Sequence, residues 1–194
     1  EISCSLVGSE MCIRDRICTD SSVLMRNTSI NNNSSRNGGG LYIGNTATVH
    51  MWMGSYINNN YAYNNGGGVY IGEKANFLLT DNNIYQNNCA KNGMGVYVRG
   101  KFQMFSIASV DESNEVYLTR QTYISIIDRL LKPSGYVAVI RTTLTDPGTI
   151  IAQVEYSTDA QSELYYVGDA VAELNNQNCV KKFSVRNIGE NKLL

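Results

Sequence analysis

The feature that most constrains the fold is a repeat of about 27 residues in which asparagines and glycines recur at fixed positions. The copies read "INNNSSRNGGGLYIG" from Ile30, "INNNYAYNNGGGVYIG" from Ile57 and, less regularly, "IYQNNCAKNGMGVYV" from Ile84. Asparagine and glycine are both poor strand formers. Their recurrence directly before an apolar alternation therefore indicates that they turn the chain between strands.

Five columns keep the same register through the three copies, with one residue of slack. They are Ile30, Ile57 and Ile84; Asn33, Asn60 and Asn87; Gly38, Gly66 and Gly93; Leu41, Val69 and Val96; and Tyr42, Tyr70 and Tyr97. Each copy holds three short apolar runs that alternate with period two and lack the period of a helix. Propeller blades are longer, and leucine-rich repeats and left-handed β-helices have motifs that this chain lacks. We therefore predict an all-β fold, a right-handed parallel β-helix with about 27 residues per coil.

Stacking of the coils gives each column a physical role. Equivalent residues of successive coils lie about 4.8 Å apart, so asparagines can form a ladder in which each amide donates to one neighbour and accepts from the other. Glycines allow positive φ at the corner and close approach of neighbouring coils. We predict structural ladders at these positions: Asn33, Asn60 and Asn87, and Gly38, Gly66 and Gly93.

The tyrosine column and Trp52 are expected to point outward, because they alternate with inward aliphatic residues. Exposed rings of Tyr42, Tyr70, Tyr97 and Trp52 would form a binding platform for sugars or proteins. The alternative is that the rings stack and stabilise neighbouring coils. The pattern favours stacking and leaves binding open.

Composition excludes several classes of protein. The chain has 16 basic and 17 acidic residues, a net charge of −1, and no basic cluster suited to nucleic acid. No apolar run approaches the roughly 18 residues of a membrane span. The cysteines form no Cys-x-x-Cys motif and fit neither a zinc site nor a disulfide framework, so we expect no cofactor.

The first sixteen residues need separate treatment. Leu6 to Arg16, "LVGSEMCIRDR", matches the translation of a transposase-type sequencing adapter. We therefore set residues 1–16 aside as an artefact rather than native sequence. On this interpretation the native segment enters near Ile17 as a fragment of a longer chain, with Cys18, Cys89 and Cys179 as its cysteines.

The glycine motifs resemble those of a known family. "GGGLYIG", "GGGVYIG" and "GMGVYVRGKFQM", each preceded by I-x-x-N, are similar to repeats of polymorphic outer membrane proteins and related adhesin-like proteins. The family has phenylalanine where this chain has Ile30, Ile57 and Ile84, and Met94 interrupts the third glycine run. The resemblance covers about residues 21–118. It implies a bacterial cell-surface or secreted β-helix with an adhesive or display role, host-surface or glycan ligands, and further coils of a longer chain as neighbours.

The rest of the chain predicts strands separated by turns. We expect strands at Tyr123–Ile127, Tyr136–Ile140, Ile150–Val154, Glu163–Val167 and Phe183–Val185. We assign residues 17–118 to β-helix coils and 119–194 to terminal coils or an irregular β cap, because the open end of a solenoid needs a cover.

Catalytic chemistry has little support in the residues. His50, the one histidine, alternates outward with no nucleophile beside it. Polysaccharide lyases and hydrolases with this fold use clustered carboxylates, whereas Glu73 and Asp81 fall in different strands or turns and Asp111–Glu115 fits a solvated loop. We predict no catalytic and no metal-binding residues. The alternative is a fragment of a carbohydrate-active β-helix enzyme whose catalytic coils lie elsewhere.

Overall fold

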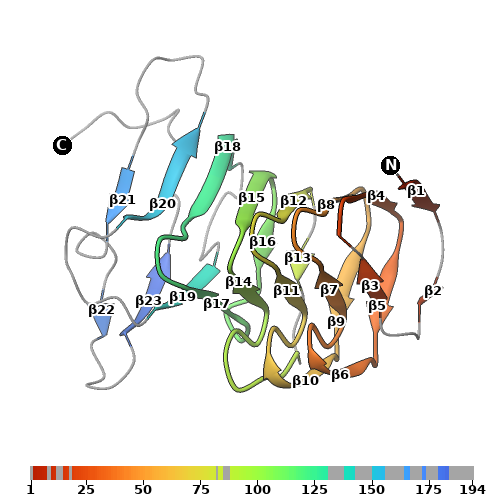
Figure 1. The fold of residues 1–194 in the computed structure, drawn as a ribbon. Coiled ribbons are helices and arrows are strands. Elements are labelled where there is room, and N and C mark those ends of the chain that lie inside the picture. The colour runs from red at the N-terminus through yellow and green to blue at the C-terminus, as the bar shows by residue number, and fades with distance from the viewer. Residues whose placement is uncertain are drawn as a thin grey trace.

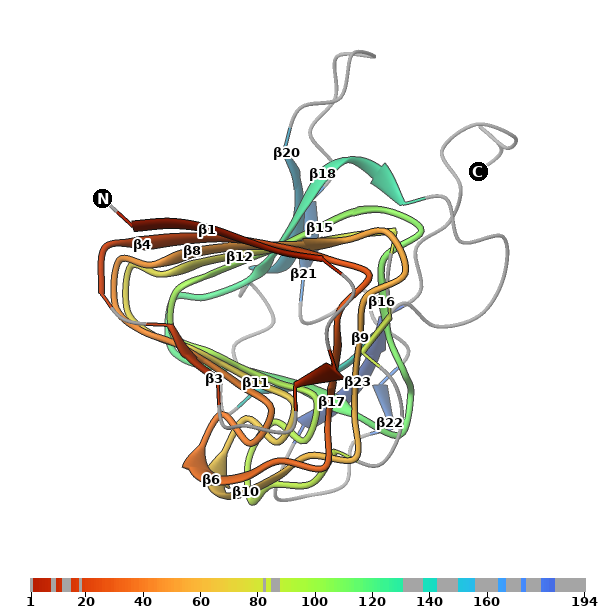
Figure 2. The ribbon, with the colours of Figure 1, turned by 90° about the vertical axis from the view of Figure 1, so that its right-hand side faces the viewer.

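The computed structural model describes residues 2–7, 10–11, 15–17, 19–81, 83–84, 88–130, 138–142, 150–155, 164–166, 172–173 and 179–183. The chain is all-β, and its parallel strands stack in about four coils with a spacing of about 26 residues. The predicted right-handed parallel β-helix is confirmed: seen from the N-terminal end in Figure 2, each coil runs clockwise around a triangle as it recedes. The described residues contain no helix long and apolar enough to cross a membrane.

Three sheets form the sides of the triangle, and their strands follow one another along the solenoid in Figure 1. Sheet A contains β1 (Ile2–Val7), β4 (Ser21–Arg26), β8 (Thr48–Trp52), β12 (Asn76–Thr80), β15 (Lys101–Ser106), β18 (Ile124–Leu130), β20 (Ile150–Glu155) and β21 (Leu164–Tyr166). Sheet B contains β2 (Glu10–Met11), β5 (Ser29–Asn31), β9 (Tyr56–Asn58), β13 (Asn83–Ile84) and β16 (Ser109–Val110). Sheet C contains β3 (Asp15–Ile17), β7 (Leu41–Ile43), β11 (Val69–Ile71), β14 (Val96–Val98), β17 (Glu115–Leu118), β19 (Ala138–Thr142), β23 (Cys179–Phe183) and β22 (Ala172–Glu173).

The register of these sheets pairs residues of the same type in neighbouring coils. Ile57 pairs with Ile30 and Ile84, and Tyr70 pairs with Tyr42 and Tyr97. Because side chains alternate along a strand, one residue of each pair of neighbours in the sequence enters the triangle and the other faces out. The columns read from the sequence are therefore vertical rows of the solenoid.

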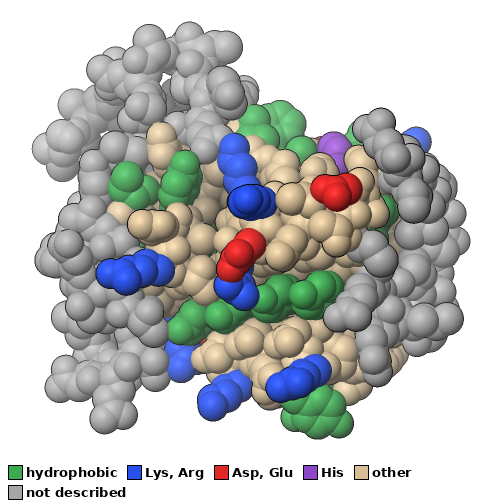
Figure 3. All heavy atoms as spheres, viewed as in Figure 1, with side chains coloured by type: hydrophobic (Ala, Val, Ile, Leu, Met, Phe, Trp, Pro, Cys, Tyr) green, Lys and Arg blue, Asp and Glu red, His purple; other side chains and the backbone are tan. Residues whose placement is uncertain are grey.

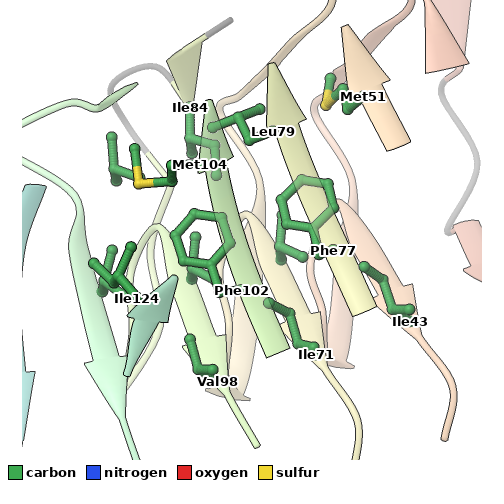
Figure 4. Packing of buried hydrophobic residues seen from close by; sticks show 14 of the residues in the cluster. Ile43, Met51, Ile71, Phe77, Leu79, Ile84, Val98, Phe102, Met104 and Ile124 are labelled. Carbon is green, nitrogen blue, oxygen red and sulfur yellow. The ribbon is translucent and has the colours of Figure 1, made fainter. Parts of the chain in front are cut away.

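The core is the inside of the triangle, filled by aliphatic, methionine and phenylalanine side chains that come from all three sheets (Figure 4). Phe77 and Phe102 stack inside it with ring centroids 5.7 Å apart, and both are fully buried. Full burial of a side chain of this kind stabilises a fold by about 1.5–3 kcal/mol. The repeated rows of apolar side chains thus stabilise the stacked coils, since a single coil could not bury its apolar residues alone.

Each of the three coils with the glycine motif also contains an element that was not predicted from the sequence. The chain leaves the triangle at the corner between sheets B and C and forms a protruding layer with β6 (Ser34–Asn37) and β10 (Tyr61–Asn65), visible at the bottom of Figure 2. Residues 89–92 add a third layer through parallel bridges from Cys89 to Tyr61 and from Asn92 to Asn65. We call residues 34–37, 61–65 and 89–92 the arm.

The two ends differ in strand direction. Within residues 1–16, set aside in the sequence analysis, the described segments pair in parallel with the next coil through β1, β2 and β3. Beyond residue 118, β18, β19 and β20 continue the parallel pairing, and β21, β22 and β23 then pair antiparallel. At the strand expected for Phe183–Val185, the structure has β23 over Cys179–Phe183, and Ser184 and Val185 lie outside the described residues.

Candidate functional site

The asparagine ladder lies at the corner where each coil leaves sheet B. Asn60 Oδ1 accepts the main-chain N–H of Asn33 at 3.0 Å and its side-chain amide at 3.2 Å. Asn60 Nδ2 donates to the carbonyl oxygens of Ile30 and Asn58 at 3.0 and 2.8 Å. Asn60 is only 1% exposed, so its amide satisfies groups that water does not reach.

The third rung of the ladder is Asn88, one residue later than the predicted Asn87. Asn88 Oδ1 accepts both the main-chain N–H and Nδ2 of Asn60, at 3.0 and 3.1 Å. The third copy has one more residue between Ile84 and the buried asparagine than the earlier copies have after Ile30 and Ile57. Asn87 itself lies outside the described residues.

The glycine column forms the next corner, where the arm returns to sheet C. Gly38, Gly66 and Gly93 all have positive φ, at 64°, 67° and 63°. A Cβ atom on Gly66 would lie 2.3 Å from the carbonyl oxygen of Val69. The expected left-handed conformation is therefore present. The close approach at Gly66 is to the backbone of its own coil, whereas close approach between coils occurs one residue later: a Cβ atom on Gly67 would lie 2.5 Å from the carbonyl oxygen of Met94.

The tyrosine column is a continuous stack whose ring faces cover one another. Ring centroids are 4.9 Å apart for Tyr42 and Tyr70, 5.4 Å for Tyr70 and Tyr97, and 5.2 Å for Tyr97 and Tyr117, with interplanar angles of 3°, 11° and 13°. The expectation that Tyr70 is exposed is wrong, because its ring lies between two others and only 8% of the residue is accessible. Burial, helped by Tyr117 and Tyr70, raises the pKa of Tyr97. The ring faces inside the stack are thus unavailable to a sugar.

Trp52 points outward from β8, as alternation predicts, but it is half-buried. The guanidinium carbon of Arg26 lies 5.4 Å from the centre of its ring, and the His50 ring lies 5.9 Å away. His50 Nε2 is 3.1 Å from Thr80 Oγ1, and burial lowers the pKa of the imidazole. Trp52 and His50 therefore form a packed cluster on the outer face of sheet A.

The outer face of the arm holds exposed aromatic residues that the sequence analysis missed. Tyr61 and Tyr63 are 42% and 65% exposed, whereas Ala62 between them is buried. The short alternation Tyr-Ala-Tyr in the second copy could have identified a strand with this outward face. We call Arg36, Tyr61, Tyr63 and Lys91 the arm face, since all four side chains are exposed.

Three acidic residues of the described part of the chain contact cationic or polar neighbours. Glu115 does not lie in a solvated loop as expected: it is buried, and its Oε1 is 3.1 Å from Arg141 Nη1. Glu73 forms an ion pair with Arg99. Asp111 accepts hydrogen bonds from the main-chain N–H and hydroxyl of Ser113 at 2.9 and 2.6 Å, which closes a local turn.

Within the described part of the chain, no group of three histidine, cysteine or acidic side chains is placed to hold a metal ion. Cys89 is a free, exposed thiol on the arm. Comparisons with models of protein families, with curated proteins and with solved structures each found no match to this chain.

Proposed function

We propose that this chain is part of a bacterial cell-surface or secreted β-helix that serves as an elongated scaffold for adhesion or display, without catalysis. The proposal draws on the resemblance of the glycine motifs to adhesin-like repeats and on the way the side chains are used. The repeated asparagines, glycines and tyrosines contact the coil above or below. These side chains thus stabilise the stacking of one coil on the next.

One observation supports a display role most directly. The exposed positions of the arm differ from coil to coil, whereas the positions between them carry the small residues Ser35, Ala62 and Ala90, which are buried or half-buried. Ser34 of the first coil pairs with Tyr61 of the second, which pairs with Cys89 of the third, and the next exposed positions are Arg36, Tyr63 and Lys91. A constant frame that carries variable outer positions is the arrangement expected of a scaffold that presents a binding surface.

The experiment is an adhesion assay with the whole chain immobilised on beads. We expect the beads to adhere to cultured epithelial cells more than beads coated with a variant in which Arg36, Tyr61, Tyr63 and Lys91 are replaced by serine. Circular dichroism would verify that both proteins fold alike. Equal adhesion of the two proteins would refute display by the arm, and release of reducing ends from polysaccharides would refute the non-catalytic assignment.

A further inference from the structure

The arm face is held in place by its own network of hydrogen bonds. Asn65 Nδ2 donates to Asn37 Oδ1 at 3.2 Å, and Asn92 Nδ2 donates to Asn65 Oδ1 at 2.9 Å, which makes a second amide ladder along the three layers. The Ser35 hydroxyl lies 2.7 Å from the carbonyl oxygen of Asn37 and 2.9 Å from that of Gly38. The exposed side chains therefore stand on a fixed backbone, and a ligand would not have to order it.

The two tyrosines of the arm face are arranged differently from the tyrosine column of sheet C. Their ring centroids are 5.0 Å apart, and their planes meet at 80°. In an edge-to-face pair only one face of one ring is covered by its partner, and Tyr63 is the most exposed large apolar side chain of the described residues. Flat apolar ring faces pack against the C–H faces of sugars, and the phenol hydroxyl can bind sugar hydroxyls.

Cationic side chains occupy the two layers of the arm that flank the layer of Tyr63. Because Tyr61 pairs with Ser34 and Cys89, Arg36 lies in the layer before Tyr63 and Lys91 in the layer after it, and the register shifts by one residue between Ala62 and Asn65. The two cations are two interstrand spacings apart along the solenoid, about 10 Å, which is about the length of two linked sugar rings. Figure 3 shows basic side chains beside an apolar group at the lower edge of the molecule, with the acidic side chains higher on that face.

The charge of the arm face selects among possible sugars. Residues 34–37, 61–65 and 89–92 include Arg36 and Lys91 but no aspartate or glutamate. A guanidinium group binds carboxylate or sulfate oxygens through paired hydrogen bonds, and an ammonium group binds them as a point charge. Neither cation would gain such contacts from a neutral sugar.

We propose that the arm face binds an anionic polysaccharide, with a sugar ring packed on Tyr63 and its acidic groups on Arg36 and Lys91. This inference rests on the proposed adhesive function and supplies its ligand class. The four exposed side chains come from successive layers of the arm, so a bound chain of sugars would lie along the solenoid axis. Because the cations are exposed, binding should weaken as salt screens them.

The test measures binding of the whole chain to hyaluronate, heparan sulfate and polygalacturonate, with dextran as the neutral polysaccharide. We expect at least one acidic polymer to bind and dextran not to bind. We expect a loss of at least tenfold in affinity for both Tyr63→Ala and the double variant Arg36→Gln/Lys91→Gln. The matched control, Lys101→Gln/Arg120→Gln, removes two exposed cations outside the arm and should retain affinity. Circular dichroism identifies any variant that fails to fold, and for such a variant Tyr63→Leu or the single charge changes replace it.

Three outcomes would overturn the inference. One is that no acidic polymer binds, and another is that the control variant loses as much affinity as the arm variants. The third is that Tyr63→Ala binds like the original chain while the charge variants do not, which would indicate simple ion exchange. If polysaccharides fail but the beads still adhere to cells through the arm, the ligand is another molecule and the display function stands.

Discussion

The carboxylate of Glu115 accepts a hydrogen bond from the main-chain N–H of Gly93 at 2.9 Å. In the two coils before it, Gly38 and Gly66 donate the equivalent N–H to the carbonyl oxygens of Asn65 and Asn92, at 2.9 and 3.0 Å. Glu115 thus replaces a main-chain acceptor at the layer where the arm stops. Arg141 of the following coil then balances the buried charge.

Replacing Glu115 by alanine should therefore destabilise the fold more than replacing it by glutamine. Alanine leaves the Gly93 N–H without its acceptor and Arg141 without its anion, and a lost hydrogen bond to a charged group costs about 1.5–3 kcal/mol. Glutamine keeps an acceptor oxygen and should show an intermediate loss. Denaturant titrations followed by circular dichroism measure both values, and equal stability of the two variants would contradict the assigned role.

Asn60→Ala should lower the free energy of unfolding by about 1–3 kcal/mol, because buried donors and acceptors in the adjacent coils lose their partner. Asn33 would lose an acceptor for its main-chain N–H, and the carbonyl of Ile30 would lose a donor. Asn64→Ala is the matched control, since Asn64 is only half-buried. If Asn60→Ala and Asn64→Ala unfolded at the same denaturant concentration, the hydrogen bonds of the ladder would not stabilise the fold.

Much of the fold could be predicted from the sequence because the columns repeat. The isoleucine, glycine and tyrosine rows follow directly from period and alternation, and the structure places each in register. The third rung was predicted at Asn87 because that residue keeps the spacing of 27, whereas the structure places the rung at Asn88. The extra residue before the rung could not be located from the repeat, because Asn87 and Asn88 are the same residue type.

The candidate site was harder to predict, for two physical reasons. Tyr117 belongs to the stack but follows a shorter coil without the glycine motif, so the repeat does not reveal it. The arm face consists of positions that do not repeat, so the columns of the sequence do not reveal Tyr63. Glu115 looked like part of an acidic turn because its partner, Arg141, is distant in the sequence.

Gly66→Ala should destabilise the fold far more than Gly54→Ala, although both glycines have positive φ, at 67° and 72°. An alanine in this conformation costs about 1–2 kcal/mol at either position. At Gly66 the new Cβ would also meet the Val69 carbonyl at 2.3 Å, whereas at Gly54 the one close atom is Asn27 Oδ1, the end of a side chain that can move. Melting temperatures of the two variants provide the comparison. A similar drop in melting temperature in both variants would mean that the positive φ alone explains the need for glycine at these positions.

Tyr70→Leu should lower the free energy of unfolding by about 1–3 kcal/mol, because it removes two stacked contacts that are each worth about 0.5–1.5 kcal/mol. Tyr63→Leu should change it by no more than about 0.5 kcal/mol, since Tyr63 is exposed. Denaturant unfolding of both variants tests whether the tyrosine column stabilises the fold and the arm face does not. A large loss for Tyr63→Leu would place that ring in a structural role instead.

His50 should make the fold less stable as the solution becomes acidic. Burial lowers the pKa of its imidazole in the folded chain, so the unfolded chain takes up this proton at a higher pH. The contribution of His50 to stability is therefore complete above the ordinary histidine pKa of about 6.5, and it falls as the pH drops below that value.

His50→Gln removes the titrating group and keeps a polar side chain beside Thr80. We expect the decrease in melting temperature between about pH 7.5 and about pH 5 to be smaller in the variant, because the carboxylates that also titrate there are common to both proteins. Parallel melting curves for the two proteins would show instead that protonation of His50 costs the folded chain nothing.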